Sequence, residues 1–217
     1  MAGILLAAGA STRMGTDKLW ADLRGKPLIA WPLQAFAASD AVDHLIVVVS
    51  ATTRDRMACL VDEIRVSATL VLGGARRQDS VRAALAAAGE SEWVVVHDGA
   101  RPLLTRKLIE DGLDAAADTG AAIAAVPVVD TVKRVEDRTV VATLDREALW
   151  AVQTPQVFRT SLLQAAHRAS SPDVTDDAAL VETLGTTVRI YMGAYENLKV
   201  TTPIDLQVAA CLLAERA

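Results

Sequence analysis

Short apolar runs rich in β-branched residues alternate with stretches rich in alanine and leucine along this chain of 217 residues. Runs such as Leu45–Val49 contain no polar residue, which is typical of strands that are buried on both faces of a sheet. The alternation predicts an α/β fold with a single doubly wound, mostly parallel sheet and right-handed crossovers. The length suits one domain and no linker or repeat interrupts the pattern, so we predict a single domain over residues 1–217.

The same pattern places the individual elements. The expected strands are Gly3–Ala7, His44–Ser50, Ala68–Leu72, Trp93–His97, Ala121–Val128 and Thr187–Met192. The expected helices are Leu28–Ala38, Thr53–Glu63, Gln78–Ala88, Thr105–Asp118, Thr160–Ala169, Asp176–Leu184 and Pro203–Glu215. Gln153–Phe158 is expected to be a connection between elements, and Thr175 is expected to be a helix N-cap followed by two first-turn acids.

One segment departs from the alternation of strands and helices. Asp130–Leu144 alternates loosely around the polar turn Glu136–Arg138, which predicts a β-hairpin with no helix close behind it. A lone hairpin is marginal in water, so this segment needs a surface to pack on. We therefore expect an arm over about residues 130–150 that protrudes from the domain and contacts a second subunit.

Composition excludes several classes of protein. The net charge of −5 and the pI near 5.2 argue against a nucleic-acid-binding protein, because no broad basic surface is available to neutralise phosphates. No apolar run is long enough to span a membrane and no signal-peptide pattern is present, so we expect a cytoplasmic protein without a membrane partner. Cys59 and Cys211 lie in apolar helical contexts and are expected to be reduced thiols in the core.

The first expected strand leads directly into a loop of small residues that carries Arg13 and Lys18. Small side chains let backbone N–H groups approach a polyanion, and the two cations add fixed positive charge nearby. The loop matches neither the dinucleotide fingerprint nor the Walker motif, because Ser11 and Met14 replace the glycines that those motifs need. A nucleotide phosphate site and an ordinary turn with two surface cations both remain open on these residues alone.

Two further turns follow expected strands and can meet the first loop, since ligands of such sheets bind beyond the carboxyl ends of the strands. Gly73 and Gly74 expose peptide groups that suit the edge of a base, and Ser80 can add a hydroxyl. Asp98 follows a buried strand and is well placed to hold Mg²⁺ between phosphates. Arg101 can pair with Asp98 or bind a second anion through both guanidinium nitrogens.

Several motifs in order along the chain resemble those of a known enzyme family. They are the Ala7–Gly9 loop with Arg13 and Lys18, then GGARRQDSV, VHDGARP, AAVPVVDTVKR, LDR, QTPQVF, TDDAALVE and NLKVTTPIDL. Together they resemble the 2-C-methyl-D-erythritol 4-phosphate cytidylyltransferases, within the larger group of sugar-phosphate nucleotidyltransferases. The resemblance extends from Ile4 to Leu206. It implies transfer of a cytidylyl group from CTP to methylerythritol phosphate, with release of pyrophosphate, as a step of non-mevalonate isoprenoid biosynthesis.

The resemblance also implies roles for individual residues. The expected catalytic residues, around the triphosphate, are Arg13, Lys18 and Lys199. The expected CTP-binding residues are Ala7, Ala8, Gly9, Gly74, Ser80 and Asp98, and Asp98 is also expected to help place Mg²⁺. The expected acceptor-binding residues are Arg101, Thr131, Arg146 and Thr154. In the family the hairpin embraces the partner of a homodimer, so Thr131 and Arg146 are expected to act in the neighbouring subunit's site.

Other functions remain open at this stage. A relative with the same fold could use ribitol 5-phosphate or another polyol phosphate as its acceptor. The segment from Ser11 to Ile29 also resembles molybdopterin nucleotidyltransferases. A CTP-binding module without catalysis is the alternative from a different class, although a mere binder has no need of charge gathered around the α-phosphate.

Overall fold

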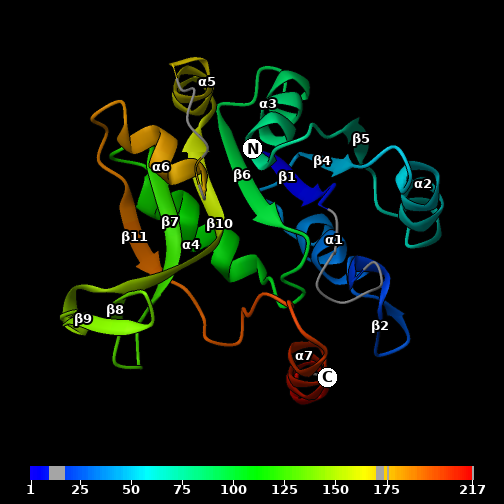
Figure 1. Ribbon diagram of the computed structural model, residues 1–217. Coiled ribbons are helices and arrows are strands. Elements are labelled where there is room, and N and C mark those ends of the chain that lie inside the picture. Colours follow the sequence, from blue (N-terminus) through cyan, green and yellow to red (C-terminus); the bar gives the residue numbers. More distant parts are fainter. Residues whose placement is uncertain (10–17, 170–173, 175, 217) are drawn as a thin grey trace.

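The computed structural model describes residues 1–9, 18–169, 174 and 176–216. A seven-stranded sheet has the order β11-β7-β10-β6-β1-β4-β5 (Figure 1). Its strands are β1 (Ala2–Ala7), β4 (His44–Val49), β5 (Thr69–Leu72), β6 (Trp93–Asp98), β7 (Ala121–Pro127), β10 (Trp150–Arg159) and β11 (Arg189–Met192). Among these described strands β10 alone pairs antiparallel with its neighbours, which confirms the mostly parallel sheet.

Helices cover both faces of the sheet, as the doubly wound prediction requires. The helices are α1 (Ala30–Ala37), α2 (Arg54–Glu63), α3 (Arg77–Ala87), α4 (Arg106–Ala116), α5 (Thr160–Ala169), α6 (Asp177–Glu182) and α7 (Pro203–Glu215). Residues of α1, α2, α4 and α7 belong to one buried apolar cluster, and those of α3, α5 and α6 belong to a second. Each expected helix is present, and its ends lie within two residues of the expected bounds.

Strands in the middle of the sheet supply side chains to both apolar clusters. In β4, Val47 and Val49 point into the first cluster, whereas Ile46 and Val48 point into the second. This alternation follows from the period of two in a strand, and it explains why Leu45–Val49 needs an apolar residue at every position.

The connection expected at Gln153–Phe158 is wrong, because these residues form most of β10, between β6 and β7. Pro155 argues against a central strand because proline cannot donate a ladder hydrogen bond. The structure accommodates it at a shift in register between Val152 and Gln156, where β10 leaves its regular pairing with β7. Gln156–Arg159 then pair with β6 on one side, and Gln156–Phe158 with β7 on the other.

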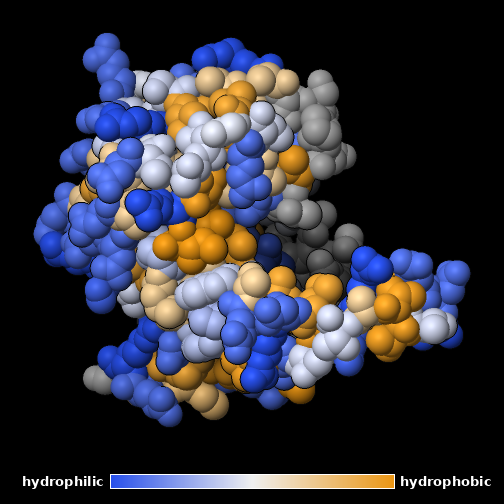
Figure 2. All heavy atoms as spheres, turned by 90° about the vertical axis from the view of Figure 1, so that its left-hand side faces the viewer, coloured by the Kyte–Doolittle hydropathy of each residue, from blue (hydrophilic) through white to orange (hydrophobic). Residues whose placement is uncertain are grey.

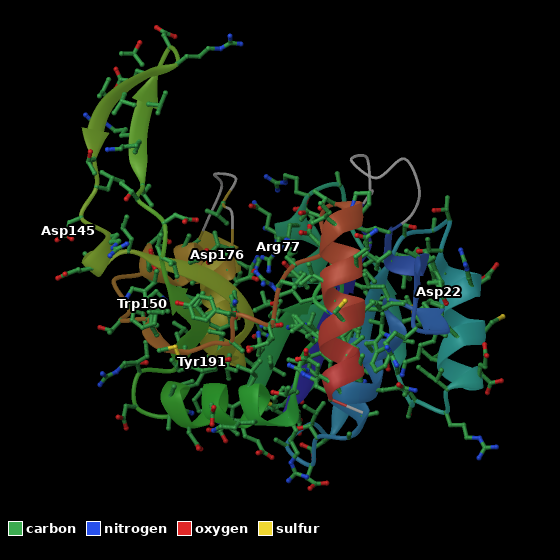
Figure 3. All side chains as sticks on the ribbon, turned by 90° about the horizontal axis from the view of Figure 1, so that it is seen from below. Asp22, Arg77, Asp145, Trp150, Asp176 and Tyr191 are labelled. Carbon is green, nitrogen blue, oxygen red and sulfur yellow. The ribbon has the colours of Figure 1, made fainter. Side chains whose placement is uncertain are left out.

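The expected hairpin is present as β8 (Lys133–Glu136) and β9 (Thr139–Thr143). Asp137 and Arg138 form its turn with φ of 46° and 63°, the left-handed backbone that two-residue hairpin turns use. The hairpin pairs with no other strand among the described residues. Figure 3 shows it projecting away from the sheet, with Asp145 and Trp150 near its base.

The two thiols correct a prediction made from the sequence. Cys59 and Cys211 are free, as expected, but both are exposed rather than in the core. In α2 the buried positions are Met57 and Leu60, so Cys59 between them faces outward. In α7 the buried positions are Ala209 and Leu213, and Cys211 again lies between them. Separately, none of the helices in the described part of the chain is long and apolar enough to cross a membrane.

Candidate functional site

Residues that follow three strands meet at the carboxyl edge of the sheet, next to the point where the order of the strands reverses. From β1 the chain moves outward to β4 and β5, and then returns to the other side of β1 to form β6. Such a switch point leaves a crevice beyond the strand ends, where ligands of these folds bind. The turns after β1, β5 and β6 all contribute to the wall of one cleft of about 380 Å³, which we call the first cleft.

The first cleft gathers most of the residues that the resemblance implicates around CTP. Its walls include Ala8, Gly9, Lys18, Gly74, Ser80, Asp98 and Lys199. Lys18 belongs to the short 3₁₀ helix η1 (Lys18–Trp20), and Ser80 lies in the first turn of α3. Ala7 is not among the lining residues, because its side chain lies in the apolar core. Arg13 lies outside the described residues.

Glycines allow the turns to approach one another closely. At Gly73 a Cβ would lie 2.6 Å from Ala8 Cβ and 2.7 Å from Ser80 Oγ, so a side chain would separate the three segments. The Gly73 N–H donates to the Val49 carbonyl at 2.9 Å, and the Gly74 N–H donates to Ser80 Oγ at 3.2 Å. Ser80 thus ties the glycine turn to the start of α3.

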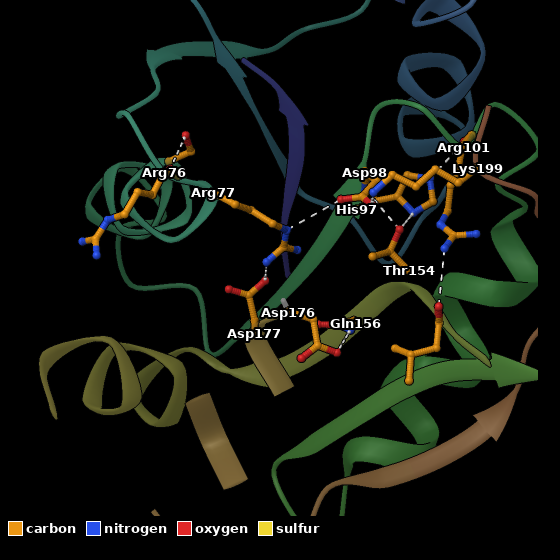
Figure 4. A network of polar contacts seen from close by, with 12 residues as sticks. Arg76, Arg77, His97, Asp98, Arg101, Thr154, Gln156, Asp176, Asp177 and Lys199 are labelled. Atoms are coloured by element: carbon orange, nitrogen blue, oxygen red, sulfur yellow. Dashed lines mark hydrogen bonds and ion pairs between the residues drawn. The ribbon is translucent and has the colours of Figure 1, made fainter. Parts of the chain in front are cut away.

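A second cleft of about 260 Å³ adjoins the first. Its walls include Arg101, Thr154, Gln153, Gln156 and Asp176. Three further residues, Arg77, Asp98 and Lys199, line both clefts. Figure 4 shows these three around the end of β6. The shared residues mark a junction at which two ligands, one in each cleft, would meet.

The Asp98 carboxylate is held between two cations at this junction. Lys199 Nζ lies 2.7 Å from Asp98 Oδ2, and Arg77 Nε lies 3.8 Å from Asp98 Oδ1. Burial alone would raise the pKa of the Asp98 carboxyl, but the positive charges of Lys199 and Arg77 outweigh burial and lower the pKa to about 2. Asp98 is therefore ionised at neutral pH.

Arg101 is a buried cation with neutral partners. Its Nη1 donates to the Asn197 carbonyl at 2.6 Å and its Nη2 to the Val152 carbonyl at 3.5 Å, while its buried Nε has no hydrogen-bond partner. Among the ion pairs of the described residues, Asp98 pairs with Lys199 and Arg77 rather than with Arg101. Burial lowers the pKa of Arg101. A buried guanidinium without a carboxylate partner is suited to receive an anionic ligand.

Thr154 is fixed by contacts inside the protein. Its hydroxyl oxygen accepts from the Asp98 N–H at 3.0 Å and lies 3.0 Å from His97 Nδ1, and the residue is 4% exposed. It therefore holds the end of β6 beside the second cleft. A direct contact of Thr154 with the acceptor stays a prediction.

The other two residues that are expected to bind the acceptor lie on the arm, away from the clefts of their own chain. Thr131 and Arg146 are both exposed and line neither cleft. Arg146 belongs to η2 (Arg146–Ala148), and its Nη1 donates to the Val129 carbonyl at 2.7 Å. Their position agrees with a role in a neighbouring subunit, and that role stays a prediction.

Sequence reasoning missed Arg77 and its partner Asp177. The expected role of Asp177 as a first-turn acid of the helix is incomplete, because its side chain is buried and its Oδ2 lies 2.6 Å from Arg77 Nη1. The N-cap of α6 is Asp176 rather than Thr175, which lies outside the described residues. The sequence did hold one signal for this pair. Two arginines at the start of a helix are unfavourable next to the helix dipole, which suggests that carboxylates elsewhere in the fold compensate them.

This fold, with a cation-lined cleft at the switch point and a second cleft that shares its charged residues, defines a nucleotidyltransferase. The structure resembles a solved 4-diphosphocytidyl-2C-methyl-D-erythritol synthase from Anaerococcus prevotii, with a TM-score of 0.88, 29% identity and coverage of 98% of this chain and 97% of that chain. It also resembles the 2-C-methyl-D-erythritol 4-phosphate cytidylyltransferase from Thermus thermophilus, with a TM-score of 0.82, 34% identity and 98% coverage of both chains.

Curated relatives narrow the class to one family. A protein from Dehalococcoides mccartyi named 2-C-methyl-D-erythritol 4-phosphate cytidylyltransferase is 47% identical over 214 residues, covering 97% of this chain and 94% of the relative. A Bacillus licheniformis protein of the same name is 44% identical over 217 residues, with the same coverage. The model of this family matches residues 1–215. The chain belongs to the 2-C-methyl-D-erythritol 4-phosphate cytidylyltransferase family, as expected, and is an enzyme rather than a binding module.

Proposed function

We propose that the chain transfers the cytidylyl group of CTP to 2-C-methyl-D-erythritol 4-phosphate at the junction of the two clefts. The observation that supports this most is that Arg77, Asp98 and Lys199 line both clefts. A nucleotide in the first cleft and a phosphorylated acceptor in the second would meet at these charges. The acceptor in this proposal is the one in the names of the relatives.

The first cleft suits CTP because it is lined both by small residues, whose backbone groups are accessible, and by cations. In this proposal Ala8, Gly74 and Ser80 line the cytidine, and Lys18 and Lys199 flank the triphosphate together with Arg13. Ala7 contributes through its backbone at the end of β1, since its side chain is in the core. Gly9 lines the first cleft, and its lack of a side chain would let the α-phosphate approach the backbone there.

The second cleft suits the phosphate of the acceptor. Arg101 is buried there without a carboxylate partner, so an incoming phosphate would supply the missing negative charge. An acceptor phosphate oxygen attacks the α-phosphorus of CTP, a new P–O–P linkage forms, and the bond to the β-phosphate breaks. Pyrophosphate leaves, and no covalent enzyme intermediate is needed. Such transfers depend mainly on positioning and on neutralising charge, which these cations provide.

Magnesium is part of the proposal, with Asp98 as its protein ligand. The described residues hold no group of three or more His, Cys, Asp or Glu side chains that could bind a metal by themselves. A single ionised carboxylate beside a triphosphate site fits Mg²⁺, which commonly takes one or two carboxylates and completes its shell with phosphates and water. When bound, Mg²⁺ would neutralise triphosphate oxygens and favour departure of pyrophosphate.

The arm supports a homodimer. Val135, Val140 and Val141 on the hairpin are 51%, 56% and 41% exposed, and Trp150 at its base is 36% exposed. Figure 2 shows apolar side chains on the arm, which stands clear of the body. An exposed apolar surface of this kind marks a protein interface. In the proposed dimer the arm brings Thr131 and Arg146 to the acceptor in the partner's second cleft.

The experiment that tests the function is pyrophosphate release with CTP and Mg²⁺, comparing methylerythritol phosphate with ribitol 5-phosphate. Release with the first acceptor alone is expected. Release with ribitol 5-phosphate alone would contradict the proposed acceptor and leave the CTP site standing.

An Arg101→Ala variant should raise the acceptor KM by about 10-fold or more, because a charged hydrogen bond contributes about 1.5–3 kcal/mol, and should leave the KM for CTP close to that of the unmodified enzyme. A cytoplasmic location stays part of the proposal, supported by two free thiols.

A further inference from the structure

Arg77 bridges two carboxylates that come from elements far apart in the sequence. Its Nη1 lies 2.6 Å from Asp177 Oδ2 at the start of α6, and its Nε lies 3.8 Å from Asp98 Oδ1 at the end of β6. Figure 4 shows the guanidinium between the two acids. Burial lowers the pKa of Arg77, but the charges of Asp177 and Asp98 outweigh burial and raise it. The guanidinium therefore remains charged in this position.

Asp177 is a rigid anchor for Arg77. Its side chain is 1% exposed, and its second oxygen, Oδ1, lies 3.3 Å from His167 Nε2 on α5. The Arg77 side chain is only partly covered, at 27% exposure, and lines both clefts. An arginine at the first position of α3 gains nothing from the helix dipole. The Asp177 contact is what holds this arginine at the helix start.

Each oxygen of the Asp98 carboxylate has a cation on its own side. Lys199 donates a hydrogen bond of 2.7 Å to Oδ2, and Arg77 lies 3.8 Å from Oδ1, at the distance of an ion pair. Lys199 is a flexible side chain with 45% exposure, whereas Arg77 is fixed by a buried partner. If Lys199 turns to the triphosphate during catalysis, Arg77 is the contact that remains to hold the carboxylate.

We propose that Arg77, anchored by Asp177, is a positioning residue that fixes the Asp98 carboxylate for the divalent cation bound with CTP. The inference rests on the proposed function, since it assigns Asp98 to the cation. Residues that orient a metal ligand commonly contribute about 10- to 100-fold to metal affinity or activity. A purely structural role, in which Arg77 only joins α3 to α6, would affect stability and not the metal.

The test uses Arg77→Gln and the double variant Arg77→Gln with Asp177→Asn. Removing a positive charge beside Asp98 would by electrostatics alone strengthen cation binding, whereas loss of positioning weakens it, so the sign separates the two effects. The double variant keeps the net charge and leaves no buried unpaired carboxylate, which guards against failure to fold. Arg82→Gln is the matched control, because Arg82 is an exposed arginine of the same helix, paired with Asp79.

The measurement is the Kd for CTP by titration calorimetry, with and without Mg²⁺, together with kcat/KM. In both Arg77 variants the gain in CTP affinity that Mg²⁺ provides should fall by about 10-fold or more, beyond any loss in the metal-free Kd that comes from removing a cation from the first cleft, and kcat/KM should also fall. Arg82→Gln should match the unmodified enzyme. An unchanged or larger Mg²⁺ gain, or an equal loss with and without Mg²⁺, would overturn the inference. Absence of activity in the unmodified enzyme would instead count against the proposed function.

Discussion

Single side chains at the end of β6 form a hydrogen-bonded chain whose protons can be assigned. The Arg101 carbonyl can only accept, so His97 Nε2, 3.1 Å away, is the protonated nitrogen. In a neutral ring Nδ1 then accepts from the Thr154 hydroxyl, 3.0 Å away, while Thr154 Oγ1 accepts from the Asp98 N–H. The imidazole is neutral and fully buried, and burial lowers its pKa to about 4.

The neutral His97 predicts a loss of stability in mild acid. Between its unfolded pKa of 6.5 and its folded pKa of about 4, His97 binds a proton in the unfolded chain but not in the folded one. The free energy of unfolding should therefore fall as pH drops through this window, by about 3 kcal/mol from this group. Urea unfolding of the unmodified protein and His97→Gln at about pH 7 and about pH 4.5 measures it.

The His97→Gln variant should have a lower free energy of unfolding than the unmodified protein at neutral pH, and that free energy should fall less on acidification. An equal pH dependence in both proteins would contradict the assignment. The Asp98 carboxyl does not confuse the result, because its depressed pKa contributes stability that is present above the unfolded value of 3.8 and is lost only as pH falls toward about 2.

Site residues can be predicted from the sequence when the residue type suits a ligand and the residue also comes at the end of an expected strand. Asp98 and Gly74 could be placed in this way, because each comes shortly after an apolar run of strand type. Arg77 could not, since its role depends on Asp177, which is 100 residues away in sequence and belongs to another helix. The exposed thiols show the same limit, because an apolar neighbourhood in sequence does not determine which side of a helix faces the core.

Among the elements, the glycine turn after β5 determines how closely α3 approaches the first cleft. Replacing Gly73 with alanine would place a Cβ 2.6 Å from Ala8 Cβ and 2.7 Å from Ser80 Oγ. Because all three segments are packed, the variant should lose about 1–3 kcal/mol of stability. It should also bind CTP about tenfold more weakly, as a cost of about 1.4 kcal/mol at the cleft. Thermal unfolding and calorimetric titration with CTP measure the two effects, and an unchanged CTP affinity would contradict the role of this turn.

Elements with a regular pattern were predictable from sequence, and β10 was not. The buried parallel strands are continuous apolar runs, whereas β10 carries Gln153, Thr154 and Gln156 and is interrupted by Pro155. The polar residues of β10 form hydrogen bonds with partners that are distant in the sequence, so a local pattern cannot indicate them. Gln153 Nε2 donates to the Ala194 carbonyl at 2.8 Å, and Gln156 Nε2 donates to Asp176 Oδ2 at 3.0 Å. Long-range hydrogen bonds thus place a polar segment inside the sheet.

At the scale of the whole molecule, the proposed dimer predicts that sites can be rebuilt from defective subunits. Lys18→Ala removes a cation from the first cleft of its own subunit, and Arg146→Ala removes the arm residue proposed to serve the partner's site. Each variant alone should be almost inactive. After mixing and subunit exchange, half of the dimers should be mixed and each should contain one intact site, so about a quarter of the original activity should return.

Steady-state pyrophosphate release after mixing and refolding measures this recovery, with sedimentation to confirm the dimer. Activity that stays at the level of the separate variants, although dimers form, would show that each subunit supplies its own Arg146. A monomer at all concentrations would contradict the arm as an interface. Two copies of Lys18→Ala mixed with each other are the matched control and should gain nothing.

The antiparallel direction of β10 has a consequence for how the enzyme could be altered. The neighbouring strands end at the clefts, but β10 starts there, so the chain that returns from the arm enters the sheet through Val152 and Thr154 in the wall of the second cleft. The arm is therefore not an appendage that could be trimmed or exchanged between relatives without cost. A deletion that shortened the arm would displace the wall of the second cleft, so the proposed subunit contact can change only together with that wall.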